Sequence, residues 1–325
     1  MNLHQLLDEQ LVMPPEYSNG LSSHLPMALH ALHSLGAGPD RLRAFYDSYI
    51  TRFQGRRTTA VTPPADWLKL RGQIESFAAL QAYFLDAIAR LGRDLTLRFA
   101  VPALIPGVSA AAFHGVIRTA HAVDAGHEGE LASALAYWAA RWSALPSVNV
   151  AIGGESMHNW TEKLQQAGDK WQPGNGLISA EMQLATNSKD WQALVASPAL
   201  PSKPLEALAR YAAKRYAETR NFTVLHLVTG CRALEVLTPW SDSEMPSHAL
   251  RAYVAAYLAS GAGSLNTQAQ HEGLDWQTLH TRAIECDDDH IIKLVHAATE
   301  WSNWCEGDDA LWRAAATTAL ASGTA

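Results

Sequence analysis

Cysteine is scarce in this sequence, and the few that occur do not form a recognisable site. The three cysteines, Cys231, Cys286 and Cys305, are widely separated, and no CxxC or CxxxC pair occurs. This spacing argues against a thiolate zinc site and against a disulfide framework. Histidine, by contrast, is abundant, with 14 residues in a chain of 325. A metal site in this protein would therefore be built from imidazole and carboxylate ligands.

Clustered positive charge and long apolar runs are also lacking. The formal net charge is −7, and the longest basic tract is Arg56-Arg57. Nucleic-acid binding depends on cationic contacts to phosphates, so we exclude that class of function. No stretch approaches the ~20 apolar residues of a membrane span, so we expect no membrane partner. Because the N-terminal segment lacks a basic region followed by an apolar run, we expect a cytoplasmic protein.

Motifs for nucleotide binding and for hydrolysis by a serine nucleophile are absent as well. The sequence contains no GxGxxG, GxxxxGK[ST] or GxSxG pattern, so it gives no basis for Rossmann, P-loop or α/β-hydrolase chemistry. It also contains no HExxH or HxH pair that would supply two metal ligands locally. A metal site would have to combine ligands from distant parts of the chain.

What is present is a helical pattern along almost the whole chain. Apolar residues recur three and four positions apart in segments that are rich in alanine and poor in β-branched residues, as helix formers are. The clearest such segments are 26–37, 40–53, 128–145, 204–219 and 247–263. Asp40 is placed as an N-cap residue and Gly36 as the residue that ends the first of these helices.

Strand patterns are too few to form a sheet. Only 95–102 and 147–154 alternate between apolar and polar residues, and both are short. The proline-rich breaks near Pro63, Pro173 and Pro201 are short enough to be loops between helices. We therefore predict an all-α fold with one large helical domain over residues 1–325.

Four histidines occupy helix starts or apolar helical faces. His24 lies just ahead of a proline that begins a helix, and His114 and His226 lie among small and apolar neighbours. His290 begins the apolar helical part of the segment "DDDHIIKLVHA", and the three acids before it suit a helix N-terminus. Taken singly, each ring is explained by a hydrogen bond to a backbone carbonyl. The periodicity alone does not bring the four together.

Arg118 and His121 share the helical face of His114, one and two turns along the chain. Arg118 could orient an anionic or phenolate substrate there, or could pair with a helix acid. His121 is a reserve candidate for the same site as His114. We name both as candidate catalytic residues.

Several segments together resemble the questin oxidase-like family, from about Glu16 to Trp301. The segments that carry the resemblance are "SSHLPMALHALHSLGA" (22–37), "FYDSYITR" (45–52), "LIPGVSAAAFHGVIRTAHAV" (104–123), "LAYWA" (135–139), "FTVLHLVTG" (222–230) and "DDDHIIKLVHA" (287–297). They occur in this order and at plausible spacing.

The resemblance implies an oxygenase with a metal site among the central helices. The fungal enzymes that name the family open the central ring of anthraquinones in polyketide secondary metabolism, by Baeyer–Villiger-type oxidation. Their chemistry is associated with non-haem iron held by histidines. For this chain the resemblance implies oxidative ring opening of the Baeyer–Villiger type or by dioxygenase C–C cleavage. It also implies Fe²⁺ or another divalent metal, O₂, and a small aromatic or polyketide-like substrate, and it leaves open a reductant such as NADPH. The ligands it implies are His24, His114, His226, His290 and Lys293.

Lys293 is the unusual member of this set. It lies one helical turn from His290, so the two side chains point the same way. A buried lysine tends to lose its proton, and a neutral amine can capture CO₂ as a carbamate, which would make carboxylated Lys293 an oxygen ligand. The alternative is that Lys293 reaches solvent or pairs with Asp289.

Two other functions remain open from the sequence. The same ligands could support a metal-dependent hydrolase that uses a metal-bound water. The chain could also be a helical protein that binds a metal or a small molecule without catalysis.

Overall fold

The structure is a computed structural model that describes residues 2–59, 61–148, 154–262 and 273–322. Within these ranges the chain forms sixteen α-helices, five short 3₁₀-helices and one two-stranded antiparallel hairpin, which confirms the predicted all-α fold. No helix in the described part of the chain is long and apolar enough to cross a lipid bilayer.

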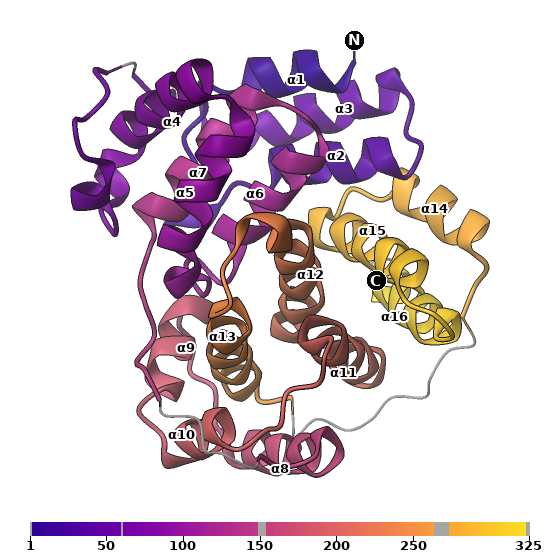
Figure 1. Ribbon diagram of the computed structural model, residues 1–325. Coiled ribbons are helices and arrows are strands. Elements are labelled where there is room, and N and C mark those ends of the chain that lie inside the picture. Colours follow the sequence, from indigo (N-terminus) through magenta and orange to yellow (C-terminus); the bar gives the residue numbers. More distant parts are fainter. Residues whose placement is uncertain (1, 60, 149–153, 263–272, 323–325) are drawn as a thin grey trace.

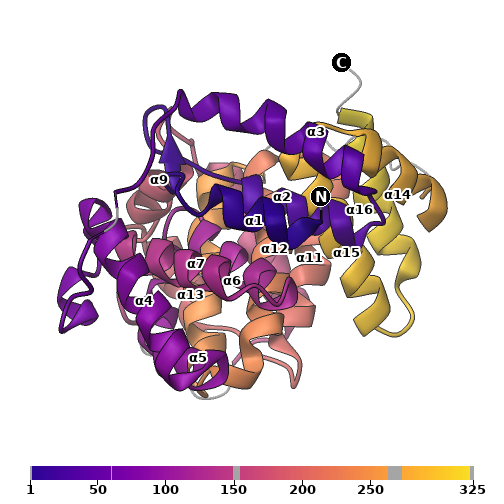
Figure 2. The same cartoon turned by 90° about the horizontal axis from the view of Figure 1, so that it is seen from above.

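The elements follow one another around a central group of helices (Figure 1). Their bounds are α1 Leu3–Gln10, β1 Glu16–Tyr17, β2 Leu21–Ser22, α2 Leu25–Ser34, α3 Pro39–Ile50, α4 Phe77–Leu91, α5 Arg93–Leu104, α6 His114–Asp124, α7 Glu128–Ala140, α8 Met157–Lys170, α9 Ile178–Ala185, α10 Lys189–Ala196, α11 Pro204–Thr219, α12 Phe222–Leu237, α13 Met245–Ser260, α14 Trp276–Glu285, α15 Asp289–Trp304 and α16 Asp309–Ser322. The N-terminal helices α1, α2 and α3 form the top of the molecule and lie nearest the viewer in Figure 2.

Four helices form a closed ring of contacts at the centre. Helix α2 packs against α6, α6 against α12, α12 against α15, and α15 returns to α2. Helix α12 is apolar on nearly every side and is almost wholly buried, as expected for a helix surrounded by others. Because the ring joins distant parts of the chain, residues far apart in sequence can meet inside it.

The sequence predicted several helix bounds closely and others less well. The segment 204–219 coincides with α11, and Gly36 has φ +100° just after α2, as a C-terminal glycine should. Asp40 is not the N-cap of α3, because Gly38 occupies that position and Asp40 lies in the first turn. The weak strand pattern at 95–102 lies within α5, and that at 147–154 falls largely outside the described residues.

Gly115 allows α6 and α7 to approach each other closely. A Cβ at this position would lie 2.8 Å from Cγ and 2.9 Å from Cα of Trp138. Because the second of these atoms is backbone, the two helices would have to separate. Gly38, by contrast, has no heavy atom within 4 Å of the place a Cβ would take, and its φ of −73° suits any residue.

We expect Gly115→Ala to destabilise the fold by about 1–3 kcal/mol, the usual cost of overpacking a core. Gly38→Ala is the control for the loss of glycine flexibility, and it should change the free energy of unfolding by less than about 1 kcal/mol. Urea denaturation of the two variants and the parent protein measures both changes. Equal midpoints for the two variants would contradict the close packing of α6 on α7.

Candidate metal centre

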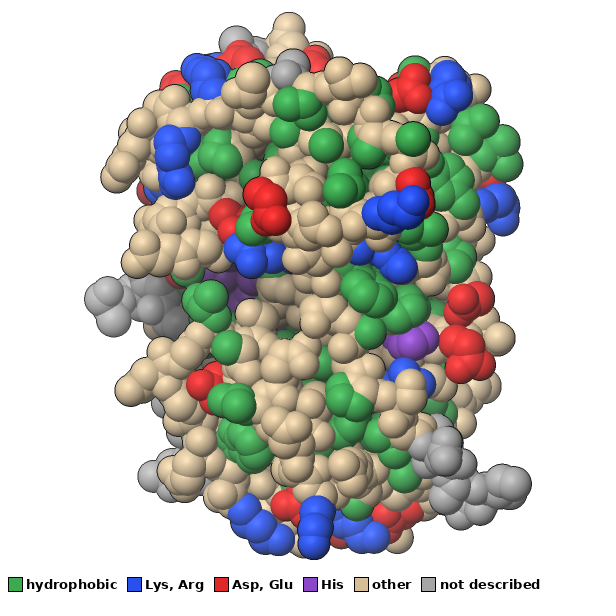
Figure 3. Space-filling model, turned by 90° about the vertical axis from the view of Figure 1, so that its left-hand side faces the viewer, with side chains coloured by type: hydrophobic (Ala, Val, Ile, Leu, Met, Phe, Trp, Pro, Cys, Tyr) green, Lys and Arg blue, Asp and Glu red, His purple; other side chains and the backbone are tan. Residues whose placement is uncertain are grey.

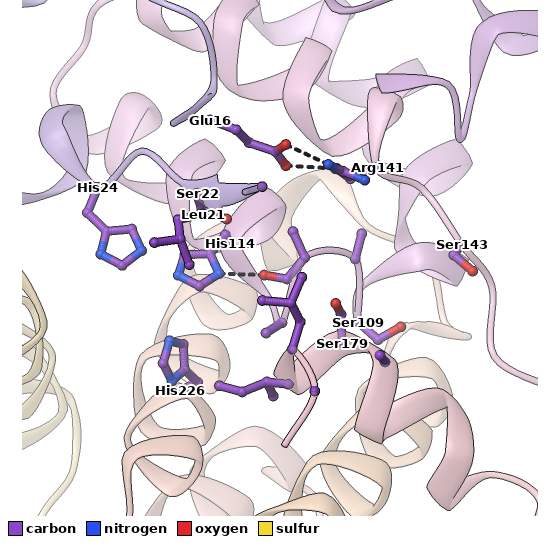
Figure 4. A pocket seen from close by; sticks show the side chains of 18 of the residues that line it. Glu16, Leu21, Ser22, His24, Ser109, His114, Arg141, Ser143, Ser179 and His226 are labelled. Carbon is purple, nitrogen blue, oxygen red and sulfur yellow. Dashed lines mark hydrogen bonds and ion pairs between the residues drawn. The ribbon is translucent and has the colours of Figure 1, made fainter. Parts of the chain in front are cut away.

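The structure brings the four predicted histidines together, one from each helix of the central ring. The ring centroids of His24 and His114 lie 4.6 Å apart with the rings stacked, and those of His24 and His290 lie 4.4 Å apart. His226 completes the group, at 5.1 Å from His114 and 5.3 Å from His290. Figure 4 shows His24, His114 and His226 at one side of the cavity.

The four rings meet because the starts of the four helices meet. His24 is the N-cap of α2, His114 is the first residue of α6, and His290 is the second residue of α15. His226 lies at the fifth position of α12. Sequence periodicity describes the faces of separate helices but does not say that their N-termini converge, which explains why it could not assemble this group.

An unusual turn leads into His114. Ala111, Ala112 and Phe113 all have positive φ, of 48°, 55° and 68°. For residues with a side chain this conformation costs about 1–2 kcal/mol each. The turn directs the carbonyl of Ala111 to the His114 ring, whose Nδ1 donates a hydrogen bond to it. The strain is therefore used to orient an imidazole.

Asp289 orients two of the histidines. Its Oδ1 lies 2.5 Å from Nδ1 of His24 and 3.0 Å from Nδ1 of His290. An ionised carboxylate only accepts hydrogen bonds, so both Nδ1 atoms carry the proton. Nη1 of Arg52 lies 3.2 Å from Oδ2 and balances the charge. His24 also donates its backbone N–H to the hydroxyl of Tyr49 at 2.8 Å.

The other two histidines are oriented by backbone carbonyls. Nδ1 of His226 donates to the carbonyl of Phe222 at 2.9 Å, as Nδ1 of His114 does to Ala111. A carbonyl cannot donate, so Nε2 of each ring carries the lone pair. Nε2 of His114 and Nε2 of His226 are buried and have no hydrogen-bond partner among the described residues. The hydroxyl of Thr229, one turn beyond His226, donates to the backbone carbonyls of Leu225 and His226.

Burial keeps the imidazoles of His24, His114 and His226 neutral. Burial, followed by the charge of Lys293, lowers the pKa of His24 to about 3, although Asp289 opposes the shift. Burial likewise places the pKa values of His114 and His226 well below the ordinary value. Burial alone would raise the pKa of Asp289, but His24, His290 and Lys293 bring it well below its usual range. Neutral imidazoles with free lone pairs are the form that binds a metal.

A metal ion fits this donor set. His24, His114 and His290 offer nitrogen atoms that lie within 4.8 Å of one another, with His226 beside them. Metal-binding histidines usually donate their second ring nitrogen to a carboxylate or a carbonyl, as His24, His114 and His226 do here, and Nδ1 of His290 lies 3.0 Å from Oδ1 of Asp289. A bound cation would give the two orphaned Nε2 atoms the partner that they lack. A second set of possible ligands lies close together and consists of Asp288, Asp289 and His290. In this set Asp288 is exposed, and its side chain already caps α15.

Lys293 lies close to this group and is unusually isolated. It is only 2% exposed, and among the residues that the structure describes it has no hydrogen-bond or ion-pair partner, Asp289 included. Burial lowers its pKa to about 8, against the opposing charges of Asp289 and Asp288. Lys293 is therefore shielded from solvent, and it lies in the electrostatic field of Asp289 without an ion-pair contact to it.

A cavity of about 750 Å³ opens beside the four histidines, and all four line it. Figure 3 shows the left-hand side of the molecule as seen in Figure 1. At mid-height this face has a hollow with a histidine visible inside it. Leu21, Leu177 and Phe222 line the cavity and are each about half exposed. At the edge seen in Figure 4, Arg141 donates to both carboxylate oxygens of Glu16, at 2.7 and 2.5 Å.

The two candidate catalytic residues lie elsewhere. Arg118 is buried and donates to both carboxylate oxygens of Glu130, at 2.5 and 2.9 Å, so its charge is already paired. It does not line the cavity. His121 is seven residues beyond His114, roughly 10 Å along the helix, and lies with His30 and His296 instead. Of the two alternatives predicted for Arg118, the structure therefore matches pairing with a helix acid.

Sequence reasoning missed the role of Asp289. The acids before His290 were assigned to the helix N-terminus, and Asp288 does cap α15 by accepting from the backbone N–H groups of His290 and Ile291. Asp289, next along the chain, points inward to two histidines instead. A carboxylate directly before a candidate ligand was the available signal, since such ligands need an acceptor for their second nitrogen.

The comparison with protein families agrees with these features. The family model described as Questin oxidase-like matches residues 21–298, a range that contains the four histidines, Asp289 and Lys293. A search of curated proteins gives no match. Because the match covers most of the chain, the protein belongs to the questin oxidase-like family, a membership that indicates an oxygenase.

Proposed function

We propose that the protein is a non-haem metal-dependent oxygenase, with Fe²⁺ as the metal, that opens a ring of an aromatic or quinone-like small molecule. The observation that carries the proposal is the pair of buried, unpartnered Nε2 atoms of His114 and His226, which lie beside a cavity lined by all four histidines. Family membership supplies the reaction class, and cleavage of the Baeyer–Villiger or dioxygenase type is compatible with this arrangement.

His24, His114, His226 and His290 are the proposed metal ligands. Neutral imidazoles suit Fe²⁺ and other borderline divalent metals and leave coordination positions for O₂ or substrate. When bound, the metal would supply the binding and reduction of O₂. Asp289, Ala111 and Phe222 hold the rings in the tautomer that presents Nε2, so the ligand geometry exists before the metal arrives.

The cavity walls provide the substrate site. A volume of about 750 Å³ lies within the usual range for small-molecule pockets. The ring of Phe222 lies 4.6 Å from that of His290 and 5.0 Å from that of His226, so an aromatic substrate stacked on Phe222 would be held next to the ligands. The apolar side chains of Leu21 and Leu177 would exclude water from its other parts.

Lys293 is proposed as a further ligand after carboxylation. An ammonium beside a divalent cation would be repelled, whereas a neutral amine attacks CO₂ and forms a carbamate with the release of one proton. The negative carbamate would then bind the cation. Burial lowers the pKa of Lys293 to about 8 and so increases the fraction of neutral amine that this step needs.

Removing the amine tests this ligand. We expect Lys293→Met to lose most of the bound metal, while the exposed Lys214→Met keeps it, as measured by elemental analysis of the purified proteins. ¹³C-labelled bicarbonate should give a carbamate resonance in the parent protein that is missing in Lys293→Met. Unchanged metal occupancy in Lys293→Met would end the ligand hypothesis.

Asp289 should control metal affinity without touching the metal. We expect Asp289→Asn to weaken binding by roughly 10–100-fold, because a neutral amide oxygen is a weaker acceptor than a carboxylate for the two Nδ1 protons, which both face Oδ1. Asp287→Asn is the matched control, since the Asp287 side chain is 81% exposed and pairs with Arg41. Competition with a chromophoric chelator measures both affinities. Equal values for the two variants would remove Asp289 from the site.

Oxygen uptake separates the proposed function from its alternatives. The Fe²⁺-loaded protein should consume O₂ when 1,8-dihydroxyanthraquinone, a quinone-like probe, is added. His226→Gln should reduce this uptake to background, and the exposed His33→Gln should not. Turnover that needs zinc and proceeds without O₂ would indicate a hydrolase instead. Metal binding with no turnover of aromatic probes would indicate a binding protein.

A further inference from the structure

A second group of histidines lies deeper in the same ring of helices. His30 follows His24 by six residues on α2, His121 follows His114 by seven on α6, and His296 follows His290 by six on α15. The same interval on α12 leads from His226 to Arg232. The four helices therefore carry two polar layers separated by roughly 9–10 Å along their axes.

The three deeper histidines are as close together as those of the first layer. Ring centroids are 5.1 Å apart for His30 and His121, 5.2 Å for His121 and His296, and 5.4 Å for His30 and His296. Imidazoles that bind one zinc ion at about 2.0–2.1 Å have centroids about 3.2 Å from it, and therefore about 5.2 Å from one another in a tetrahedral array. All three observed separations agree with this value.

Arg232 and two carboxylates flank the three rings. Arg232 is the cation of the layer, and it is paired with two carboxylates, those of Asp124 and Glu300. One guanidinium and two carboxylates leave a net charge of −1. Oε1 of Glu300 also lies 3.8 Å from Nε2 of His296. Because Asp124 and Glu300 are about one quarter exposed, an ion can enter from that end of the layer.

The rings are buried and neutral, and one of them has a nitrogen without a partner. Burial, then the charge of Arg232, lowers the pKa of His30 to about 3 and those of His121 and His296 well below the ordinary value. Nδ1 of His296, a residue that is 3% exposed, has no hydrogen-bond partner among the described residues.

The nitrogens are not yet arranged around one point. Nδ1 of His30 and Nδ1 of His121 lie 2.8 Å apart as a hydrogen-bonded pair, and His296 stands apart from them with Glu300. The three nitrogens do not form a group as compact as that of His24, His114 and His290. A half-turn of an imidazole about its Cβ–Cγ bond exchanges its nitrogen and carbon edges while its centroid stays almost in place. Ring rotation alone could therefore convert the centroid arrangement into a ligand set.

We propose that His30, His121 and His296 form a second metal site, for a borderline divalent cation such as Zn²⁺, with Glu300 as a carboxylate ligand. The proton between His30 and His121 moves to Nε2 of the ring that carried it, which frees both Nδ1 lone pairs for the cation. The cation also gives Nδ1 or Nε2 of His296 a partner. Imidazole and carboxylate ligands suit this class of cation. The proposal stands on its own residues and does not depend on the function assigned to the cavity.

Metal stoichiometry tests the second site. We expect the chelator-treated protein to bind two equivalents of Co²⁺, followed by visible d–d absorption and by elemental analysis, and Zn²⁺ to displace them. His121→Gln should bind one equivalent, His226→Gln should bind the other, and the double variant should bind none. His33→Gln, an exposed histidine on α2, should keep both.

Two results would overturn the proposal. One is that the parent protein binds a single equivalent of Co²⁺ and that His226→Gln binds none. The upper layer would then account for all of the bound metal. The other is a stoichiometry of two that remains in His121→Gln. In either case the three rings are a hydrogen-bonded part of the core only. Circular dichroism of each variant, compared with the parent, identifies those that fold and can be counted.

Discussion

The carboxylate of Asp289 is the interaction on which the candidate metal centre depends. It joins the start of α15 to the start of α2, closes the central ring of helices at one end, and fixes the tautomers of His24 and His290 together. A carboxylate that is 4% exposed would be costly to bury without compensation. Two imidazole N–H groups, the Arg52 guanidinium and the N-terminus of α15 provide that compensation. One acidic residue thus links the packing of two helices to the chemistry of two ligands.

The remaining polar atoms of the site divide into satisfied and unsatisfied nitrogens. Every Nδ1 of the four histidines has an acceptor, whereas Nε2 of His114 and Nε2 of His226 are buried with none. A buried polar atom without a partner costs about 1–3 kcal/mol, so the metal-free site stores an energy that a cation would release. Binding of a cation here would be coupled to folding, because the unfolded chain does not hold these nitrogens together.

The sequence could predict what lies within one helix but not what lies between helices. Periodicity predicted α11 in full and most of α3 and α13, because these patterns are local. It also singled out His24, His114, His226 and His290, but the family resemblance was needed to associate them. Asp289, the positive-φ turn before His114 and the pairing of Arg118 with Glu130 depend on the relative placement of helices. His121 shares a helical face with His114, but it lies two turns away with His30 and His296 and so belongs to another group.

The two polar layers of the central ring differ in a way that bears on their roles. The upper layer has a histidine on all four helices and opens to a cavity, so any metal held there could meet a small molecule. In the deeper layer Arg232 stands where the fourth histidine would be, and its carboxylate partners fill the adjoining space. A metal there would have no open position for a substrate. Catalytic metal sites keep an open coordination position and structural ones are closed. By this criterion the upper layer is suited to catalysis, and the deeper layer is suited to holding α2, α6 and α15 in register beneath it.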